Sequence, residues 1–282
     1  NWQGGAFTPV SARQFKVTGY ASQATQELFA SERGLVTCVM PATAYRDFGN
    51  VLATAQRSGF ALANLKTLSE AGAPDQIYLA AELVGCISGA EGDQQLWDRV
   101  FRGATEPGLR SVQVRRSTPE SAVLFRGSST TATFDHCALL VVKPHAVREG
   151  HTGEIVNSLI DANFEISAMQ TFSLSRKEAE NFTEVYDGVI PKSEYANLTS
   201  ELSSGPLVAI EVRAENCVEE LRKLVGPHEI EVAKRLRPTS LRARFGLSDT
   251  KNAIHCTDLA EDGQLDSGYF FDILLNQPSP AH

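Results

Sequence analysis

The residues best suited to chemistry in this 282-residue chain gather in its C-terminal half. His255 lies in the run KNAIHCTDL, after an apolar triplet and before a polar trio. An imidazole has an ordinary pKa near ~6.5, so it is neutral at physiological pH, can attack a phosphoryl group and can leave again. Arg222 and Arg242 carry planar forks that match phosphate oxygens, and Lys143 adds a compact positive charge. Taken together, these residue types favour phosphoryl transfer through a histidine.

Other interpretations of the same residues stay open at this point. A single buried histidine is more often a core residue than a nucleophile. The neighbours His255, Cys256 and Asp258 suggest zinc, but adjacent strand residues point to opposite faces, so we expect no metal held by protein ligands. The run RLRPTSLRAR resembles a nucleic-acid patch, yet it is short and the chain has a formal net charge of −8. We therefore expect binding of a small phosphorylated ligand and no nucleic acid.

Composition indicates a soluble, well-packed protein, with 42% hydrophobic and 21% charged residues. The five cysteines form no C-x-x-C pair and mostly lie in apolar runs, which favours buried reduced thiols and a cytoplasmic location. No apolar run approaches the ~18 residues that cross a bilayer, so we expect no membrane partner. Because the chain begins with Asn1 and shows no leader pattern, we expect it to be part of a longer polypeptide.

An internal repeat organises the elements that must position these residues. The segment CVMPATAYRDFGNVLATAQRSGFALANLKTLS (38 to 69) matches VVKPHAVREGHTGEIVNSLIDANFEISAMQTFS (141 to 173). Both segments indicate a strand, a proline-containing turn, an amphipathic helix and a second strand. The alignment places Gly49 over Gly153 and Thr67 over Thr171.

The second copy continues with a helical pair (175 to 203), a strand (206 to 212) and a helix (215 to 225). An irregular loop (226 to 249), a short strand (252 to 256) and a final helix (262 to 274) follow. Without the helical pair this order is βαββαβ, the ferredoxin-like arrangement of an antiparallel sheet with helices on one face. We predict an α+β fold of two tandem ferredoxin-like domains, at 34–128 and 134–276, with 1–33 as the end of a preceding module.

The first copy keeps the core pattern and loses the polar residues. It has no helical pair, and no histidine occurs before His136. Met40 and Ala122 stand at the positions of the lysine and of the second arginine, and Arg99 alone remains. We predict that this copy is catalytically dead and structural.

The second copy resembles nucleoside diphosphate kinases over residues 134 to 275. The resemblance rests on VVKPHAV, SGPLVAIEV, LRPTSLRARFG and NAIHCTDL. It implies two tandem nucleoside-diphosphate-kinase-like domains, of which the C-terminal one passes the γ-phosphate of ATP or another nucleoside triphosphate to a nucleoside diphosphate. Mg²⁺ is then expected to arrive on the nucleotide phosphates. The tandem arrangement and the HCTDL run resemble most the tandem-domain ciliary members of this family.

The resemblance also implies a role for each residue at a matching position. His255 corresponds to the phosphorylated histidine, and Asp266 falls where a glutamate orients the imidazole. The residues that match nucleotide-binding positions are Lys143 at the γ-phosphate, Arg222 and Arg242 as a phosphate clamp, and Asn252 near the ribose.

Three positions depart from the family pattern, and the helical pair is difficult to align. His228 replaces a threonine that contacts a phosphate, Cys256 replaces a glycine and Thr257 replaces a serine. In the helical pair we predict that Tyr195 stacks on the base. Tyr186 is a weaker candidate for reaching a phosphate.

Two functions of different classes follow from these patterns. The first is a nucleoside diphosphate kinase of the cytoplasm and cytoskeleton, in the axoneme of a cilium or flagellum, with one active and one dead domain. The alternative is a structural protein that contacts tubulin, the axonemal doublet or microtubule-organising proteins and retains residual nucleotide binding. In either case the two copies are expected to pack as a pseudo-dimer.

Overall fold

The computed structural model describes residues 7–10, 13–16, 32–70, 73–87, 92–101 and 107–277. Strands β1 (Phe7–Val10) and β2 (Arg13–Lys16) pair antiparallel as a hairpin. The rest of the predicted preceding module, 1–33, lies almost wholly outside the described residues. No helix in the described part of the chain has the length and apolarity to cross a membrane.

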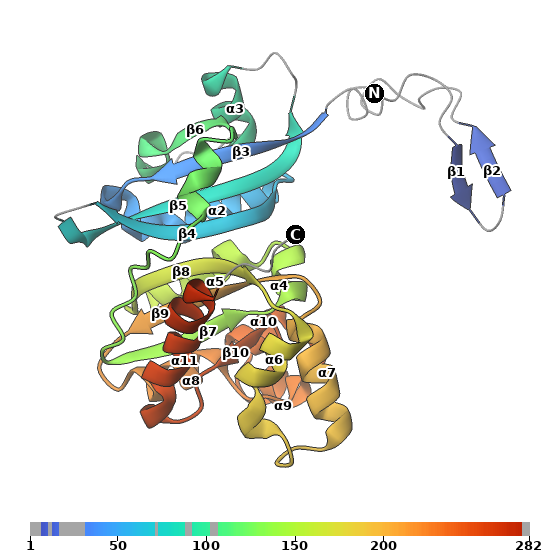
Figure 1. Cartoon of the computed structure of the whole chain (residues 1–282), viewed down its shortest axis with the longest axis vertical. Helices are drawn as coiled ribbons and strands as arrows, with labels where there is room; N and C mark the ends of the chain where they lie inside the picture. Colours follow the sequence, from blue (N-terminus) through green and yellow to red (C-terminus); the bar gives the residue numbers. More distant parts are fainter. Residues whose placement is uncertain are drawn as a thin grey trace.

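The other strands form one eight-stranded sheet in the order β10-β7-β9-β8-β4-β5-β3-β6 (Figure 1). The first half contributes β3 (Glu32–Met40), β4 (Ala61–Glu70), β5 (Ala73–Ile87) and β6 (Gln113–Arg116), and the second half contributes β7 (Cys137–Val142), β8 (Glu165–Ser173), β9 (Pro206–Arg213) and β10 (Ile254–Cys256). Neighbouring strands are antiparallel throughout. The second half has the ferredoxin-like order, which confirms the predicted α+β class; the domain boundaries stay a prediction.

Helices connect these strands in both halves. The first half has η1 (Ala42–Asp47), α2 (Phe48–Arg57), α3 (Asp93–Val100), η2 (Pro107–Ser111) and η3 (Ser121–Phe125). The second half has α4 (Pro144–Arg148), α5 (Thr152–Asp161), α6 (Arg176–Phe182), η4 (Glu184–Tyr186), α7 (Lys192–Leu202), α8 (Cys217–Val225), α9 (Ile230–Leu236), α10 (Leu241–Phe245), η5 (Ala260–Asp262), α11 (Gly263–Gly268) and the π-helical η6 (Tyr269–Leu274). The predicted helical pair is α6 and α7. The segment expected to be an irregular loop contains α9 and α10 instead.

Apolar side chains cover both faces of the sheet in the second half. Alternation along β7 sends Leu140 and Val142 to the large core cluster, which also takes in α2, α5 and α8. Leu139 and Val141 face the opposite way, toward a smaller cluster with the aromatic side chains of η6 and α6. The expectation of helices on one face only is therefore wrong here, because Phe270 and Phe271 seal the second face.

The two halves meet where β4 pairs with β8 and α2 packs on α5. Lys66 pairs with Gln170 across this seam, and the repeat alignment places the same two residues over one another. A residue that faces its own repeat equivalent lies on a twofold axis, as in an isologous dimer interface. The two copies therefore pack as a pseudo-dimer within one chain.

Two glycines let α2 and α5 approach at backbone distance. A Cβ added to Gly153 would lie 2.1 Å from the backbone N of Ala53, and one added to Gly49 would lie 2.4 Å from the backbone N of Asn157. The alignment places Gly49 over Gly153 and Ala53 over Asn157. The same close contact thus occurs twice, once on each side of the axis.

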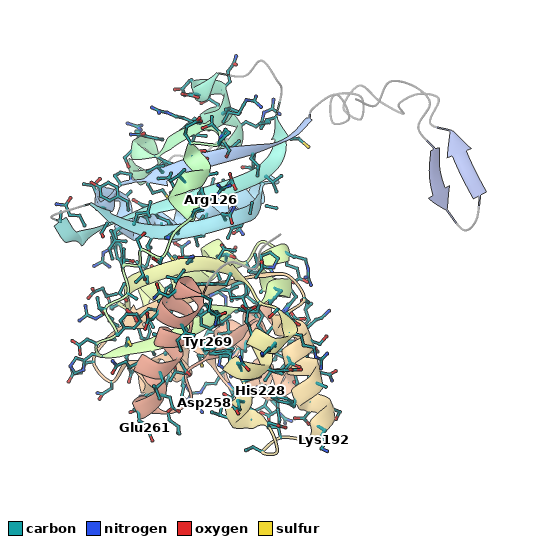
Figure 2. All side chains as sticks on the ribbon, in the orientation of Figure 1. Arg126, Lys192, His228, Asp258, Glu261 and Tyr269 are labelled. Carbon is teal, nitrogen blue, oxygen red and sulfur yellow. The ribbon has the colours of Figure 1, made fainter. Side chains whose placement is uncertain are left out.

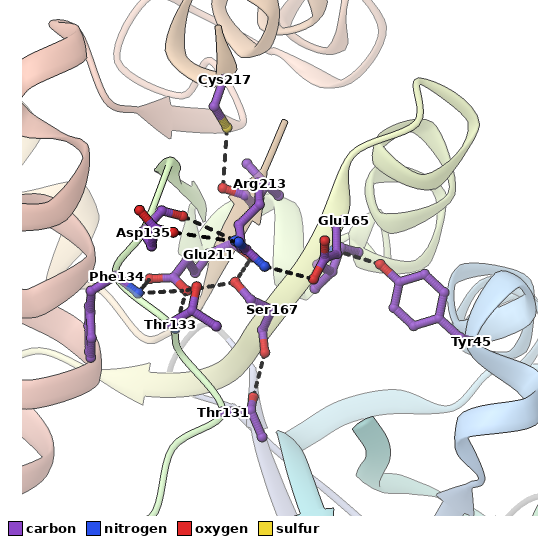
Figure 3. Close-up of polar contacts among 12 residues, drawn as sticks. Tyr45, Thr131, Thr133, Phe134, Asp135, Glu165, Ser167, Glu211, Arg213 and Cys217 are labelled. Carbon is purple, nitrogen blue, oxygen red and sulfur yellow. Dashed lines mark hydrogen bonds and ion pairs between the residues drawn. The ribbon is translucent and has the colours of Figure 1, made fainter. Parts of the chain in front are cut away.

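The segment that joins the halves is hydrogen-bonded to both of them, and Figure 3 shows its bonds to the second half. Thr131 Oγ1 donates to the carbonyl of Ser167 at 2.6 Å, and Lys66 Nζ donates to the carbonyl of Gly127 at 3.0 Å. The fully buried carboxylate of Glu211 accepts from Thr133 N at 2.7 Å and from Ser167 Oγ at 2.6 Å. This polar segment therefore lies across the boundary between the two halves and is held there by hydrogen bonds.

Candidate active site

A cavity of about 870 Å³ opens in the second half, on the side away from the first half. Figure 2 shows two of its lining residues, His228 and Asp258, at that end of the molecule. Its volume lies within the range of small-ligand sites. Seven of the candidates named from the sequence line it: Lys143, Tyr186, Arg222, His228, Arg242, Asn252 and His255.

His255 lies on the edge strand β10, paired with Val141 of β7. Its side chain is 9% exposed, and the edge of the Phe182 ring approaches it at 5.0 Å between centroids. Burial, followed by the positive charge of Lys143, lowers the pKa of His255 far below its ordinary value. The imidazole is therefore neutral at physiological pH, as a nucleophile must be.

Lys143 follows the last residue of β7 and precedes α4, so the end of the strand fixes its backbone. Its buried ammonium donates to Asn252 Oδ1 at 2.7 Å and to the carbonyl of Thr250 at 3.0 Å. Burial, with Arg242 as the next cause, lowers the pKa of Lys143 to about 7. Whether Lys143 is protonated near neutral pH therefore depends on the charges that surround it.

Asn252 links Lys143 to His228. Its Oδ1 accepts from Lys143, which leaves Nδ2 to donate to the Nδ1 and to the carbonyl of His228 at 3.2 and 3.4 Å. Since His228 Nδ1 accepts, the ring proton lies on Nε2. Burial lowers the pKa of His228, so the ring is a neutral donor at the position where the family pattern has a threonine.

The two arginines reach the cavity from α8 and α10. Arg242 donates to the carbonyls of Gly226 at 2.9 Å and Ile254 at 3.1 Å, so its guanidinium is held beside β10. Arg222 forms an ion pair with Asp258, which also accepts from the Tyr186 hydroxyl. Asp258 therefore joins the Arg222 guanidinium of α8 to the Tyr186 hydroxyl at the rim of the cavity.

Sequence reasoning missed the part played by Asp258, although an acidic residue three positions after the histidine was a usable signal. Burial opposes its ionisation, but the hydrogen bond from Tyr186 and the positive charge of Arg222 outweigh burial and lower the pKa of Asp258. Tyr186 was the weaker candidate of the helical pair, and its ring lies 6.1 Å from that of His255.

Tyr195 does not belong to the cavity, so the prediction that it stacks on a base is wrong. Its hydroxyl donates to the carbonyl of Glu180 on α6 at 3.2 Å. Ile190, Glu194 and Leu198, spaced four residues apart, line the cavity instead. The predicted position is one residue too far along α7, and a step of one residue turns a side chain by ~100° around the helix axis, here away from the cavity.

Asp266 lies beside Thr257, whose hydrogen bond opposes the burial that raises the pKa of Asp266 to about 6. Its side chain is one methylene shorter than the glutamate of the family pattern. Among the described residues no hydrogen bond joins Asp266 to His255. The carboxylate whose charge acts most strongly on the His255 ring belongs to Asp258. The expected orienting role of Asp266 therefore has no support in the geometry.

No group of three His, Cys, Asp or Glu side chains able to hold a metal occurs in the described part of the chain. Asp258, which lines the cavity, is already bound to Arg222 and Tyr186.

The first half has no matching set among its described residues. Met40 is fully buried in the core. Arg99 on α3 donates to the carbonyl of Cys86 at 3.4 Å.

Comparison with known proteins points in the same direction as the geometry. A family model described as nucleoside diphosphate kinase matches residues 136–274. The rat protein named nucleoside diphosphate kinase homolog 7 is 49% identical over 150 residues, which cover 53% of this chain and 38% of that protein. The nucleoside diphosphate kinase of Aquifex aeolicus is 33% identical over 133 residues, covering 47% of this chain and 92% of that protein. A crystal structure of the Aquifex aeolicus kinase gives a TM-score of 0.46 at 32% identity, covering 49% of this chain and 96% of that one.

Proposed function

Because the chain belongs to the nucleoside diphosphate kinase family, we propose that its C-terminal half transfers the γ-phosphate of a nucleoside triphosphate to a nucleoside diphosphate through phospho-His255. One observation supports this activity above the others. A neutral, buried imidazole lines the same cavity as three cationic side chains, those of Lys143, Arg222 and Arg242.

Each residue has a task in the first half-reaction. The His255 imidazole attacks the γ-phosphorus, the bond from the γ-phosphorus to the bridging oxygen breaks, and the nucleoside diphosphate leaves with the electron pair. Lys143, Arg222 and Arg242 stabilise the negative charge spread over the phosphoryl oxygens. Arg222 must exchange Asp258 for a phosphate when the ligand binds. A second nucleoside diphosphate then attacks phospho-His255 and restores the ring.

A Mg²⁺ ion bound with the nucleotide would neutralise part of the phosphate charge. The chain provides the fixed part of the site. Asn252 holds the Lys143 ammonium in place, and the neutral His228 ring offers its Nε2 proton. Both groups are already held in place, so neither has to be ordered when a ligand binds, whereas Arg222 has to change its partner.

Trapping the intermediate tests this activity. Purified protein incubated with γ-labelled ATP should acquire acid-labile, base-stable label, and His255→Ala should abolish it. His136→Ala is the matched control, because that ring is 84% exposed beside Asp135. The control should label like the parent. A parent protein that acquires no label contradicts the proposed transfer.

A structural role for the first half is the second part of the proposal. Its strands and helix pack tightly on the second half, while the residues of the cavity lie outside it. We infer that it serves as a packing and docking domain, with tubulin or microtubule-organising proteins of the ciliary axoneme as partners in the cytoskeleton. High-salt extraction of axonemes tests this location: a protein within the doublet wall stays with the microtubules, and release with loosely held outer components contradicts it.

A further inference from the structure

Glu201, near the C-terminal end of α7, forms two hydrogen bonds to the turn that carries Lys143. Its Oε1 accepts from the backbone N of His145 at 3.1 Å and bonds to His145 Nδ1 at 2.7 Å. Both side chains are buried, with 5% of Glu201 and 2% of His145 exposed. Glu201 thereby anchors the turn two residues beyond Lys143 from the same helix whose other end lines the cavity.

Lys143 needs a source of negative charge that its direct partners do not supply. Both acceptors of its ammonium are neutral oxygens, on Asn252 and Thr250. Arg242 acts on it with a like charge, and burial removes the water that would otherwise stabilise the ammonium. The negative charge of Glu201 acts in the opposite direction and raises the pKa of Lys143.

The Glu201 carboxylate is ionised where it meets His145. Its Oε1 lies 2.7 Å from His145 Nδ1, and the buried Nε2 of the same ring has no hydrogen-bond partner among the described residues. Burial alone would raise the pKa of Glu201, but the bonds from His145 outweigh burial and lower that pKa. The carboxylate therefore carries a negative charge close to the 143–145 segment.

We propose that Glu201 is a positioning residue for phosphate binding: through His145 it fixes the 143–145 turn, and it supplies the buried charge that keeps the Lys143 ammonium positive. The consequence for catalysis depends on the proposed function, since it concerns the grip of Lys143 on a nucleotide phosphate. The direction in which the loss of this charge shifts the pKa of Lys143 is fixed by its sign. Loss of the Glu201 charge favours the neutral amine of Lys143 and weakens phosphate binding at neutral and alkaline pH. The charged and titratable groups that act on or with Lys143 are Arg242 from α10, His255 and Cys256 from β10, His228 from the loop before α9, and Glu201 from α7.

A direct titration of Lys143 tests the charge without any ligand. The ε-carbon signal of ¹³C-labelled lysine, assigned with Lys143→Met, should titrate near pH 7 in the parent protein. Glu201→Gln keeps the shape and both acceptor contacts but removes the charge, so the midpoint should fall by about one pH unit. Glu201→Met gives the same prediction if the glutamine variant does not fold. Glu184→Gln, an exposed carboxylate on the same hairpin, is the matched control and should leave the midpoint unchanged.

Binding of MgADP as a function of pH then tests the consequence. A one-unit fall in the midpoint makes Glu201→Gln about tenfold weaker than the parent near pH 8, with affinities that converge near pH 5.5. Glu201→Asp should restore much of the parent profile. A uniform loss at every pH, or a Lys143 midpoint unmoved in Glu201→Gln, overturns the inference. If the parent binds no MgADP at all, the proposed function fails, and the lysine titration still decides the inference.

Discussion

Substitution of Gly153 by alanine tests the packing of the two halves. The new Cβ would lie 2.1 Å from Ala53 N, 2.6 Å from Ala53 Cα and 2.8 Å from the carbonyl oxygen of Gly49. All three neighbours are backbone atoms, so no side-chain rotation relieves the contact. Ordinary contacts begin at 3.4 Å, and α2 and α5 must therefore separate by roughly 1 Å.

The energetic cost follows from the same geometry. Overpacking of this kind costs about 1–3 kcal/mol, whereas glycine-to-alanine changes inside helices return up to about 1 kcal/mol. Gly268→Ala is the matched control. Gly268 has helical backbone angles, and a Cβ there meets no atom within 4 Å. The difference between the two variants isolates the overpacking, and we expect about 1–3 kcal/mol lower stability for Gly153→Ala.

Urea unfolding of both variants, with the parent alongside, measures this difference. Amide hydrogen exchange adds a local readout, because Met169 N donates to Thr67 Oγ1 across the seam at 2.9 Å. Protection of the Met169 amide should fall in Gly153→Ala and persist in Gly268→Ala. Equal unfolding midpoints together with unchanged Met169 protection would refute the close packing of α2 on α5.

Three further outcomes follow from the structure. The affinity of the parent protein for MgADP should weaken as the pH rises through about 7. Burial lowers the pKa of Lys143 to about 7, so its ammonium is lost above that pH. Calorimetric titration at several pH values measures this affinity. Asp258→Asn should bind MgADP more tightly than the parent, because Arg222 no longer pairs with a carboxylate. The free energy of unfolding should change by less than about 1 kcal/mol, because the Arg222–Asp258 pair is exposed. Weaker MgADP binding by this variant contradicts the prediction. Glu211→Ala should cost about 2–4 kcal/mol in urea unfolding, because Thr133 N and Ser167 Oγ lose a buried acceptor and a void remains.

The sequence predicted the parts of the site that lie on strands and at strand ends. His255 and Lys143 belong to short motifs whose position is set by β10 and β7, and these two strands pair directly. An apolar strand leaves little freedom in where its end lies. The proximity of residues next to such strands could therefore be predicted from the sequence.

The parts that escaped prediction depend on helical phase and on contacts distant in the chain. Tyr195 and Glu194 are neighbours in sequence, yet only Glu194 faces the cavity. The bond between Glu201 and His145 joins positions that no local pattern connects. Likewise, the closure of the second sheet face by Phe270 and Phe271 depends on where the last helix returns to the sheet.

The first half contributes none of the residues that line the cavity and yet packs closely on the second half, and the sheet explains why this packing matters. Within the four strands of the second half, β10 with His255 forms one edge and β8 forms the other. An exposed edge strand presents unpaired backbone groups that invite association with other chains. The first half pairs its β4 with β8 through Lys66 and Gln170 and so covers this edge. This task requires the strand, the α2 helix and the small residue Gly49, and none of the side chains that line the cavity. A first half without those side chains can therefore still be required for a folded second half.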